Sequence, residues 1–160
     1  MHGRLREFPL NPDYAEMLSA LSAENVEFLI VGAFAVAADD VPRATGDIDI
    51  WVNPDCSNAE RVWRALLRFG APLVNLSPAD FTHPSRVCQI GVRPQRIDFM
   101  TSISGVEWTE AWPTRLNANV EGLTLPILSA ELLVRNKRAT GRPQDLVDAD
   151  SLERRRSKKK

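Results

Sequence analysis

Two kinds of hydrophobic pattern alternate along the sequence. In the longer segments apolar residues recur every three or four positions, which predicts amphipathic helices. These segments span residues 11–25, 57–70, 129–141 and 142–155. In shorter runs apolar and β-branched residues lie between glycine, proline or polar residues, which predicts strands. These runs span residues 26–32, 46–52, 86–92 and 95–103, and a strand pair that turns at Glu121-Gly122 is expected after them.

The interleaving of helices and strands indicates an α/β (α+β) fold in which helices flank a mixed β-sheet. Local signals mark the ends of several helices. Asn11 is expected to cap the first helix, because it precedes a proline at the first helical position. Ser57 and Glu60 stand in capping-box relation at the start of the second helix, and Gly70 is expected to end it.

The composition is typical of one globular domain, since 44% of the 160 residues are hydrophobic and 26% are charged. We expect a single domain over residues 1–153 and a basic, disordered tail over 154–160. The tail sequence RRRSKKK holds six basic residues, and setting these six aside takes the net charge from −1 to −7. A basic tail can steer a protein toward nucleic acid, and a solvated chain end is the alternative interpretation.

The sequence favours a cytoplasmic protein with no membrane partner. Cys56 and Cys88 have neither a metal-binding spacing nor a disulfide pattern, as expected for a reducing compartment. No run approaches the roughly 18 to 20 apolar residues that span a bilayer. The first eight residues, MHGRLREF, lack the apolar core of a signal peptide.

The predicted strand DIDIWV carries two acids, Asp47 and Asp49, among apolar residues. Side chains alternate faces along a strand, so both carboxylates and Trp51 are expected on one face. Two anions this close need a cation between them or a raised pKa on one of them. A solvated strand edge with surface ion pairs is the alternative, because D-x-D alone is a common sequence.

A third acid, Asp98, lies between apolar residues in the predicted strand QRIDFMTSI. If this strand is a neighbour of DIDIWV, Asp98 stands beside the other two acids. Three carboxylates on one sheet face are the ligands that two Mg²⁺ ions require for in-line nucleotidyl transfer, with Mn²⁺ as a substitute.

Gly32 ends a buried strand in LIVGAFAV, where a short helix is expected to begin. Backbone N–H groups at such a turn bind phosphate well, and a glycine lets the phosphate approach closely. Any tight strand–helix turn can use glycine, so this motif gains weight only together with the D-x-D pair and Asp98.

These motifs together resemble the DNA polymerase β-like nucleotidyltransferase superfamily. The resemblance rests on FLIVGAFAVAADDVPRATGDIDIWV, on RIDFMTSISG and on NKRATGRPQDLVDADSLE, and it covers most of residues 27–152. It is strongest to minimal bacterial nucleotidyltransferases of the abortive-infection or type IV toxin–antitoxin kind. The fold it implies is the nucleotidyltransferase fold.

The resemblance implies roles for particular residues. Asp47 and Asp49 would ligate two Mg²⁺ ions, and Asp98 would complete the metal site and act on the acceptor hydroxyl. Gly32 and Ala33 would hold the triphosphate. The family usually has glycine or serine where Ala33 stands, so a serine contact to phosphate is absent.

Four further residues are candidates for contact with the nucleotide. Arg43 and Thr45 precede the D-x-D pair and would contact phosphate or form an ordinary turn. Lys137 is expected to neutralise phosphate charge, with a solvated helix face as the alternative. For Arg142 an ion pair with Asp145 or Asp148 is slightly favoured over phosphate. Trp51 is the tryptophan considered for a place near the nucleobase, although tryptophans more often pack in a core.

The function predicted from these residues is transfer of a nucleoside monophosphate from an NTP, such as ATP, to a hydroxyl, with release of pyrophosphate. The acceptor can be a tRNA, a protein side chain or a small molecule, and a cognate toxin or antitoxin is a further expected partner. The first alternative is an inactive nucleotide-binding or antitoxin module of the same fold. A Mg²⁺-dependent phosphohydrolase is a weaker alternative, because Trp51 stands where an aspartyl-phosphate motif has threonine.

Overall fold

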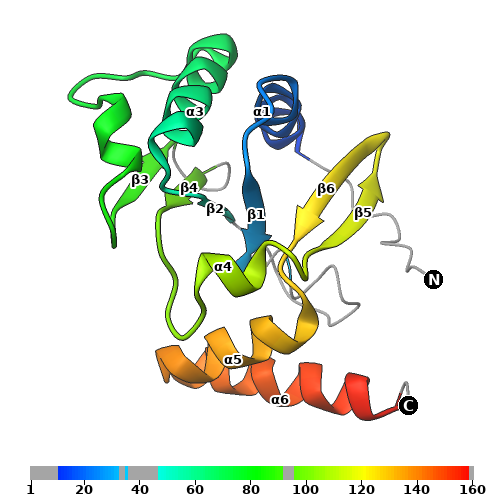
Figure 1. Cartoon of the computed structure of the whole chain (residues 1–160). Coiled ribbons are helices and arrows are strands. Elements are labelled where there is room, and N and C mark those ends of the chain that lie inside the picture. The colour runs from blue at the N-terminus through cyan, green and yellow to red at the C-terminus, as the bar shows by residue number, and fades with distance from the viewer. Residues whose placement is uncertain (1–10, 33–34, 36–46, 92–95, 159–160) are drawn as a thin grey trace.

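The computed structural model describes residues 11–32, 35, 47–91 and 96–158 (Figure 1). The helices are α1 (Pro12–Ala23), α3 (Cys56–Phe69), α4 (Trp108–Ala111), α5 (Ala130–Thr140) and α6 (Pro143–Lys158), with a 3₁₀ helix η1 (Pro78–Phe81). The strands are β1 (Phe28–Val31), β2 (Asp47–Val52), β3 (Val87–Ile90), β4 (Arg96–Met100), β5 (Leu116–Val120) and β6 (Leu123–Ile127). The elements predicted from hydrophobic patterns in these residues are confirmed.

All the described strands form one mixed sheet in the order β3-β4-β2-β1-β6-β5. The pairs β1–β2, β3–β4 and β5–β6 are antiparallel, whereas β2–β4 and β1–β6 are parallel. The predicted mixed sheet with flanking helices is therefore confirmed. At the expected turn between β5 and β6, Glu121 and Gly122 both have positive φ values of 51° and 84°, as a tight hairpin requires.

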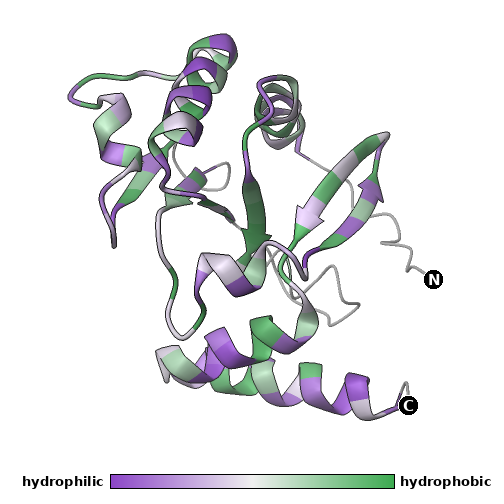
Figure 2. Cartoon of the chain, in the orientation of Figure 1, coloured by the Kyte–Doolittle hydropathy of each residue, from purple (hydrophilic) through white to green (hydrophobic). Residues whose placement is uncertain are grey.

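The hydrophobic pattern explains how the sheet is covered. The central strand β1 is buried on both faces and is hydrophobic throughout (Figure 2). In β2 the residues Ile48, Ile50 and Val52 are fully buried, while Asp47 and Asp49 on the other face are partly exposed. Figure 1 shows α1 and α3 together near the start of β1, and α4, α5 and α6 near its end. The two acids therefore lie near the α5–α6 side of the molecule, because β2 runs antiparallel to β1.

Asn58 fastens the start of β1 to the end of β2. Its Oδ1 accepts a hydrogen bond of 2.7 Å from the backbone N–H of Glu27. Its Nδ2 donates to the carbonyl of Glu27 at 3.0 Å and to the carbonyl of Asn53 at 2.9 Å. The side chain is fully buried, so these bonds satisfy it where water is excluded. They support the strand register on which the position of the acids depends.

Two helix ends differ from the sequence-based expectation. The N-terminal cap of α3 is Asp55 and not Ser57. The carboxylate of Asp55 accepts hydrogen bonds from the N–H groups of Ser57 and Asn58 at 3.1 and 3.4 Å. A carboxylate is a strong acceptor at the positive end of a helix. At the other end of the chain, α6 continues to Lys158, so residues 154–158 of the basic segment are helical. Cations are favourable in the last turn of a helix, which explains this extension.

No helix in the described parts of the chain has both the length and the apolar character needed to cross a membrane.

Candidate functional site

The strand register brings the three predicted acids together. Strands β2 and β4 are parallel neighbours, and Asp49 lies directly opposite Asp98. Residues that face each other across a pair of strands point to the same side of the sheet. Asp47 lies two residues before Asp49 and therefore shares this side. The expectation that Asp98 stands beside the D-x-D pair is confirmed.

Arg96 lies between two of these acids and was not predicted as a site residue. In the register it stands opposite Asp47, and it precedes Asp98 by two positions, so it points to the same face. Its Nη2 is 2.9 Å from Asp47 Oδ2, and its Nε is 3.0 Å from Asp98 Oδ1. The spacing to Asp98 was the available sequence signal, but the contact with Asp47 follows only from the strand pairing.

Asp49 differs from its two neighbours. Among the described residues no side chain or backbone group donates a hydrogen bond to its carboxylate or forms an ion pair with it. Its pKa is raised from 3.8 to about 6, first by burial and then by the charges of Asp98 and Asp47, while Lys137 and Arg96 oppose the rise. A partly buried carboxylate with two anionic neighbours and no donor is suited to binding a cation.

Gly32 lies against Asp49 at the end of β1. Its φ is +73°, a backbone conformation that favours glycine. A Cβ at this position would overlap Asp49 Oδ2 and would lie 3.0 Å from Asp49 Cγ. The predicted glycine turn and the predicted acid are thus in direct contact, so that a group bound at the turn would also meet the carboxylate.

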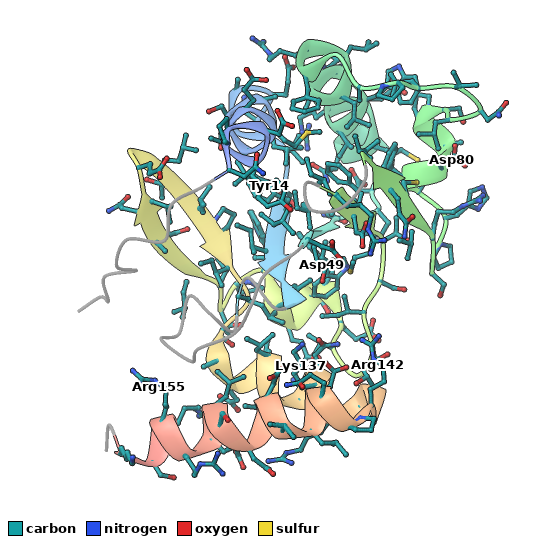
Figure 3. All side chains as sticks on the ribbon, turned by 180° about the vertical axis from the view of Figure 1, so that it is seen from behind. Tyr14, Asp49, Asp80, Lys137, Arg142 and Arg155 are labelled. Atoms are coloured by element: carbon teal, nitrogen blue, oxygen red, sulfur yellow. The ribbon has the colours of Figure 1, made fainter. Side chains whose placement is uncertain are left out.

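Tyr14 is a second residue near the acids that the sequence did not indicate. It is buried in α1, and its hydroxyl donates a hydrogen bond of 3.3 Å to the carbonyl of Arg96. Burial raises the pKa of Tyr14, and the charges of Asp47, Asp98 and Asp49 raise it further. Figure 3 shows Tyr14 on α1 and Asp49 on β2 of the sheet. The hydroxyl therefore remains protonated beside the anionic cluster.

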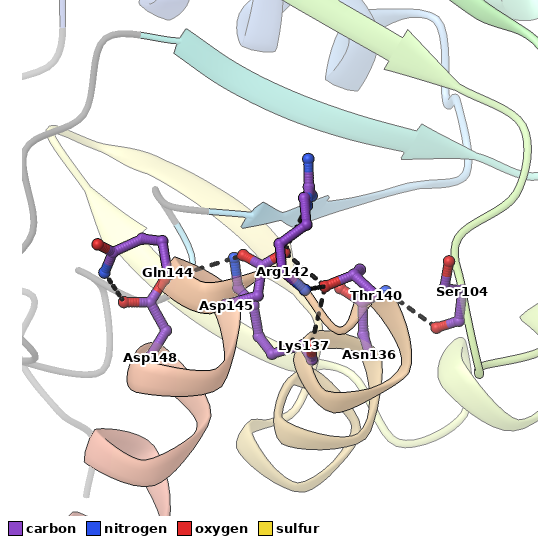
Figure 4. A network of polar contacts seen from close by, with 8 residues as sticks. All are labelled: Ser104, Asn136, Lys137, Thr140, Arg142, Gln144, Asp145 and Asp148. Atoms are coloured by element: carbon purple, nitrogen blue, oxygen red, sulfur yellow. Dashed lines mark hydrogen bonds and ion pairs between the residues drawn. The ribbon is translucent and has the colours of Figure 1, made fainter.

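Lys137 lies in a buried ion cluster between α5 and α6 (Figure 4). Its Nζ is 3.0 Å from Asp145 Oδ1 and 3.6 Å from Asp148 Oδ2. Burial pushes the pKa of Asp145 up, but hydrogen bonds from Thr140 and Lys137 outweigh it, and the pKa falls below its ordinary value. The ammonium group was expected at a phosphate and is held here by two carboxylates, yet it is near enough to lower the pKa of Asp49.

Arg142 also pairs with Asp145, as was slightly favoured from the sequence. Its Nε donates to Asp145 Oδ2 at 2.8 Å, while 75% of its side chain is exposed. The α5 helix is fastened to the loop after β4, because Asn136 Nδ2 donates to the carbonyl of Ser104 at 2.9 Å (Figure 4). This contact connects the position of Lys137 to the strand that carries Asp98.

Trp51 does not lie where it could stack on a nucleobase. It shares the strand face of the acids but is only 2% exposed. Its ring meets that of Trp108 edge to face, with centroids 5.0 Å apart, and Trp108 stacks on Trp112 at 5.4 Å. The α4 helix covers this end of β2, so the idea of a base platform at Trp51 is wrong.

The remaining predicted contacts, Ala33, Arg43 and Thr45, lie outside the described residues. Within the described ranges, no three histidine, cysteine or acidic side chains have positions that could hold a metal ion without rearrangement. The donor chemistry nevertheless fits a hard divalent cation, because three carboxylates share one face and Asp49 accepts no hydrogen bond there. In this structure the Arg96 guanidinium lies between Asp47 and Asp98 and neutralises part of their charge.

Several solved structures have a similar fold. A proposed nucleotidyltransferase from Thermotoga maritima matches with a TM-score of 0.57 and 18% identity, over 97% of this chain and 99% of that one. The antibiotic-resistance factor ANT(2″)-Ia matches at 0.56 and 15%, over 89% and 86%, and a crystal structure of that protein holds adenylyl-2″-tobramycin. An antigenic nucleotidyltransferase-like protein from Paracoccidioides brasiliensis matches at 0.53 and 20%, over 88% and 74%.

No protein-family model and no curated protein sequence matches the chain. At these levels of identity the structural likeness establishes the fold, and it covers nearly the whole chain. The chain therefore has the nucleotidyltransferase fold.

Proposed function

We propose that this protein is a metal-dependent nucleotidyltransferase that moves a nucleoside monophosphate from an NTP to a hydroxyl group. The observation that carries the proposal is the alignment of Asp49 with Asp98 across β2 and β4, beside the Gly32 turn. Three acids on one side of a sheet, beside a glycine turn, are the parts that this chemistry needs. The shared fold of the structural matches supports the proposal.

Asp47, Asp49 and Asp98 would hold two Mg²⁺ ions, with Mn²⁺ as a substitute. When bound, such ions neutralise the phosphate charge and lower the pKa of the acceptor hydroxyl. In the transfer the hydroxyl oxygen bonds to the α-phosphorus, the bond from that phosphorus to the bridging oxygen breaks, and pyrophosphate leaves. Asp98 is the carboxylate that we propose accepts the hydroxyl proton, because it is the most buried of the three.

Gly32 and Ala33 would receive the triphosphate at the end of β1. The absence of a Cβ at Gly32 lets the Asp49 carboxylate lie against this turn, so a phosphate bound at the turn would stand next to that carboxylate. We propose that Arg43 and Thr45 also contact phosphate or acceptor. Arg142 has a largely exposed side chain and is free to turn toward phosphate.

Lys137 is the cation we propose to act on the triphosphate from inside the protein. Lys137 is only 5% exposed, and its ammonium is held by Asp145 and Asp148. From that position its charge already lowers the pKa of Asp49, so its field reaches this carboxylate. It would therefore favour a triphosphate there without leaving its carboxylate partners.

The acceptor is a tRNA, a protein side chain or a small hydroxylated molecule, and the transfer assay decides among these. A toxin or antitoxin protein is a proposed partner, and the proposed compartment is the cytoplasm. Purified protein is incubated with Mg²⁺ and α-labelled NTPs, in separate reactions with total tRNA, cell protein and aminoglycosides. Label on one acceptor class, with equal release of pyrophosphate, supports the proposal and identifies the acceptor.

Matched variants make the assay specific. Asp49→Asn should abolish transfer, whereas Asp80→Asn, which changes an acid of η1 that pairs with Arg86, should leave it unchanged. NTP binding by calorimetry without label on any acceptor would indicate an inactive nucleotide-binding module. Release of inorganic phosphate in place of pyrophosphate would indicate a phosphohydrolase.

A further inference from the structure

Arg96 lies between Asp47 and Asp98, two of the three acids proposed to hold metal, and forms ion pairs with both. We propose that this guanidinium is an internal counter-cation which competes with divalent metal for the two carboxylates and so sets the metal affinity of the site. The inference rests on the proposed function, because it concerns the same three acids. Arg96 would then be a further residue that determines how tightly the three acids bind divalent metal.

The competition follows from the atoms involved. Arg96 Nη2 lies 2.9 Å from Asp47 Oδ2 and 3.2 Å from Asp98 Oδ2, and Arg96 Nε lies 3.0 Å from Asp98 Oδ1. Both oxygens of Asp98 are therefore engaged. Mg²⁺ binds carboxylate oxygens at about 2.0–2.1 Å and demands near-octahedral geometry. A metal shared by the two acids must therefore approach Asp98 at an oxygen that Arg96 already contacts, where the two cations repel each other.

The surroundings allow Arg96 to give way. Its side chain is 22% exposed, whereas that of Asp98 is 10% exposed, so the cation is on the solvent side of the acid. A guanidinium can turn outward without leaving a buried charge behind, provided that another cation replaces it at the carboxylates. Asp49 accepts no hydrogen bond from the described residues, and so it is the ligand that metal can engage before Arg96 moves.

A different role for Arg96 predicts the opposite change in metal affinity when the arginine is removed. If the guanidinium served to orient Asp47 and Asp98 for the metal, removing it would weaken metal binding. If it displaces metal, removing it tightens metal binding and lowers the stability of the metal-free protein. The sign of one binding measurement therefore separates the two roles, and damage to the fold does not imitate tighter binding.

The experiment measures Mn²⁺ and Mg²⁺ binding by titration calorimetry in wild type, Arg96→Met and Arg96→Lys, with thermal unfolding in EDTA. We expect Arg96→Met to bind Mn²⁺ about ten- to a hundredfold more tightly, since charge-assisted hydrogen bonds no longer oppose the metal. Its metal-free melting temperature should fall below that of wild type, and metal should raise it more. Arg96→Lys keeps a charge but loses the planar fork and should lie between the two.

Arg86→Met is the matched control. It removes an arginine that pairs with Asp80 at 3.3 Å near the start of β3, without touching the three acids. Its metal affinity should equal that of wild type. Unchanged or weaker Mn²⁺ binding by Arg96→Met overturns the inference, and if that variant does not fold, Arg96→Lys decides by the same criterion. Absence of metal binding in every variant would instead overturn the proposed metal site itself.

Discussion

The Cα of Gly32 lies so close to the carboxylate of Asp49 that a Cβ at position 32 would overlap Asp49 Oδ2. The two residues are not neighbours in the sequence, and β1 and β2 bring them together through the pairing of Val31 with Asp49. The contact connects the turn that we propose for phosphate with the acid that we propose for metal. It also makes the glycine testable in two independent ways.

Gly32→Ala should destabilise the protein by about 2–4 kcal/mol, because it adds backbone strain at positive φ and a collision with Asp49. Urea denaturation measures the change. Gly122→Ala is the control, since φ there is +84° but nothing lies within 4 Å of the added Cβ. The loss at Gly32 should exceed the loss at Gly122, and in an Asp49→Ala background the excess should shrink. Equal losses at the two glycines would contradict the contact.

The raised pKa of Asp49 predicts how stability depends on pH in the absence of metal. Between 3.8 and about 6 the folded state holds a proton on Asp49 that the unfolded state has released. The free energy of unfolding in EDTA should therefore decrease as the pH rises through this window, by up to about 3 kcal/mol. Thermal denaturation between pH 4.5 and 7.5 measures it.

The Asp49→Asn variant is the control for this pH dependence. It should lose the decrease and should be more stable than wild type at pH 7, because a neutral amide has no repulsion with the other acids. Mg²⁺ should stabilise wild type more at pH 7 than at pH 5, since it binds the ionised carboxylate. A pH dependence that survives in Asp49→Asn would assign it to another group.

Asp49→Asn and Asp98→Asn should change stability in opposite directions although both abolish transfer. Asp98 is 7% exposed and receives two contacts from Arg96, so its neutralisation weakens charge-assisted hydrogen bonds, at a loss of about 1–3 kcal/mol. Asp49 has no such donor among the described residues. Denaturation in EDTA together with the label-transfer assay tests both. If both variants were destabilised or both stabilised, the contacts of Arg96 with Asp98 would not be the reason for a difference between the two acids.

Lys137→Met should destabilise the protein by about 3–5 kcal/mol, because it leaves Asp145 and Asp148 without their buried ammonium. Arg138→Met on the same helix is the control. Arg138 pairs with Asp150 and Glu153 on an exposed surface, and its loss should amount to less than about 1 kcal/mol. Both are measured by urea denaturation. Similar small losses for the two variants would show that the buried cluster contributes little to the folded state.

Local sequence determined much of this structure. The ends of α1 and α5 follow from the caps at Asn11 and Ser129, whose side chains accept hydrogen bonds from nearby N–H groups. The shared face of Asp47 and Asp49 follows from the two-residue period of a strand. Even the proximity of Asp98 was predicted, on the condition that its strand lies next to β2. These features depend on residues a few positions apart, where the backbone geometry is known in advance.

Only the tertiary structure decided which charges meet. Arg96 reaches Asp47 because the parallel pairing of β2 with β4 has one particular register, and no local pattern specifies a register between distant strands. Lys137 is buried with Asp145 because α5 and α6 pack against each other. Trp51 is covered because Trp108 lies over it. A contact between segments far apart in the chain is determined by how all the elements pack together, and the pattern within one segment does not specify the register with its partner.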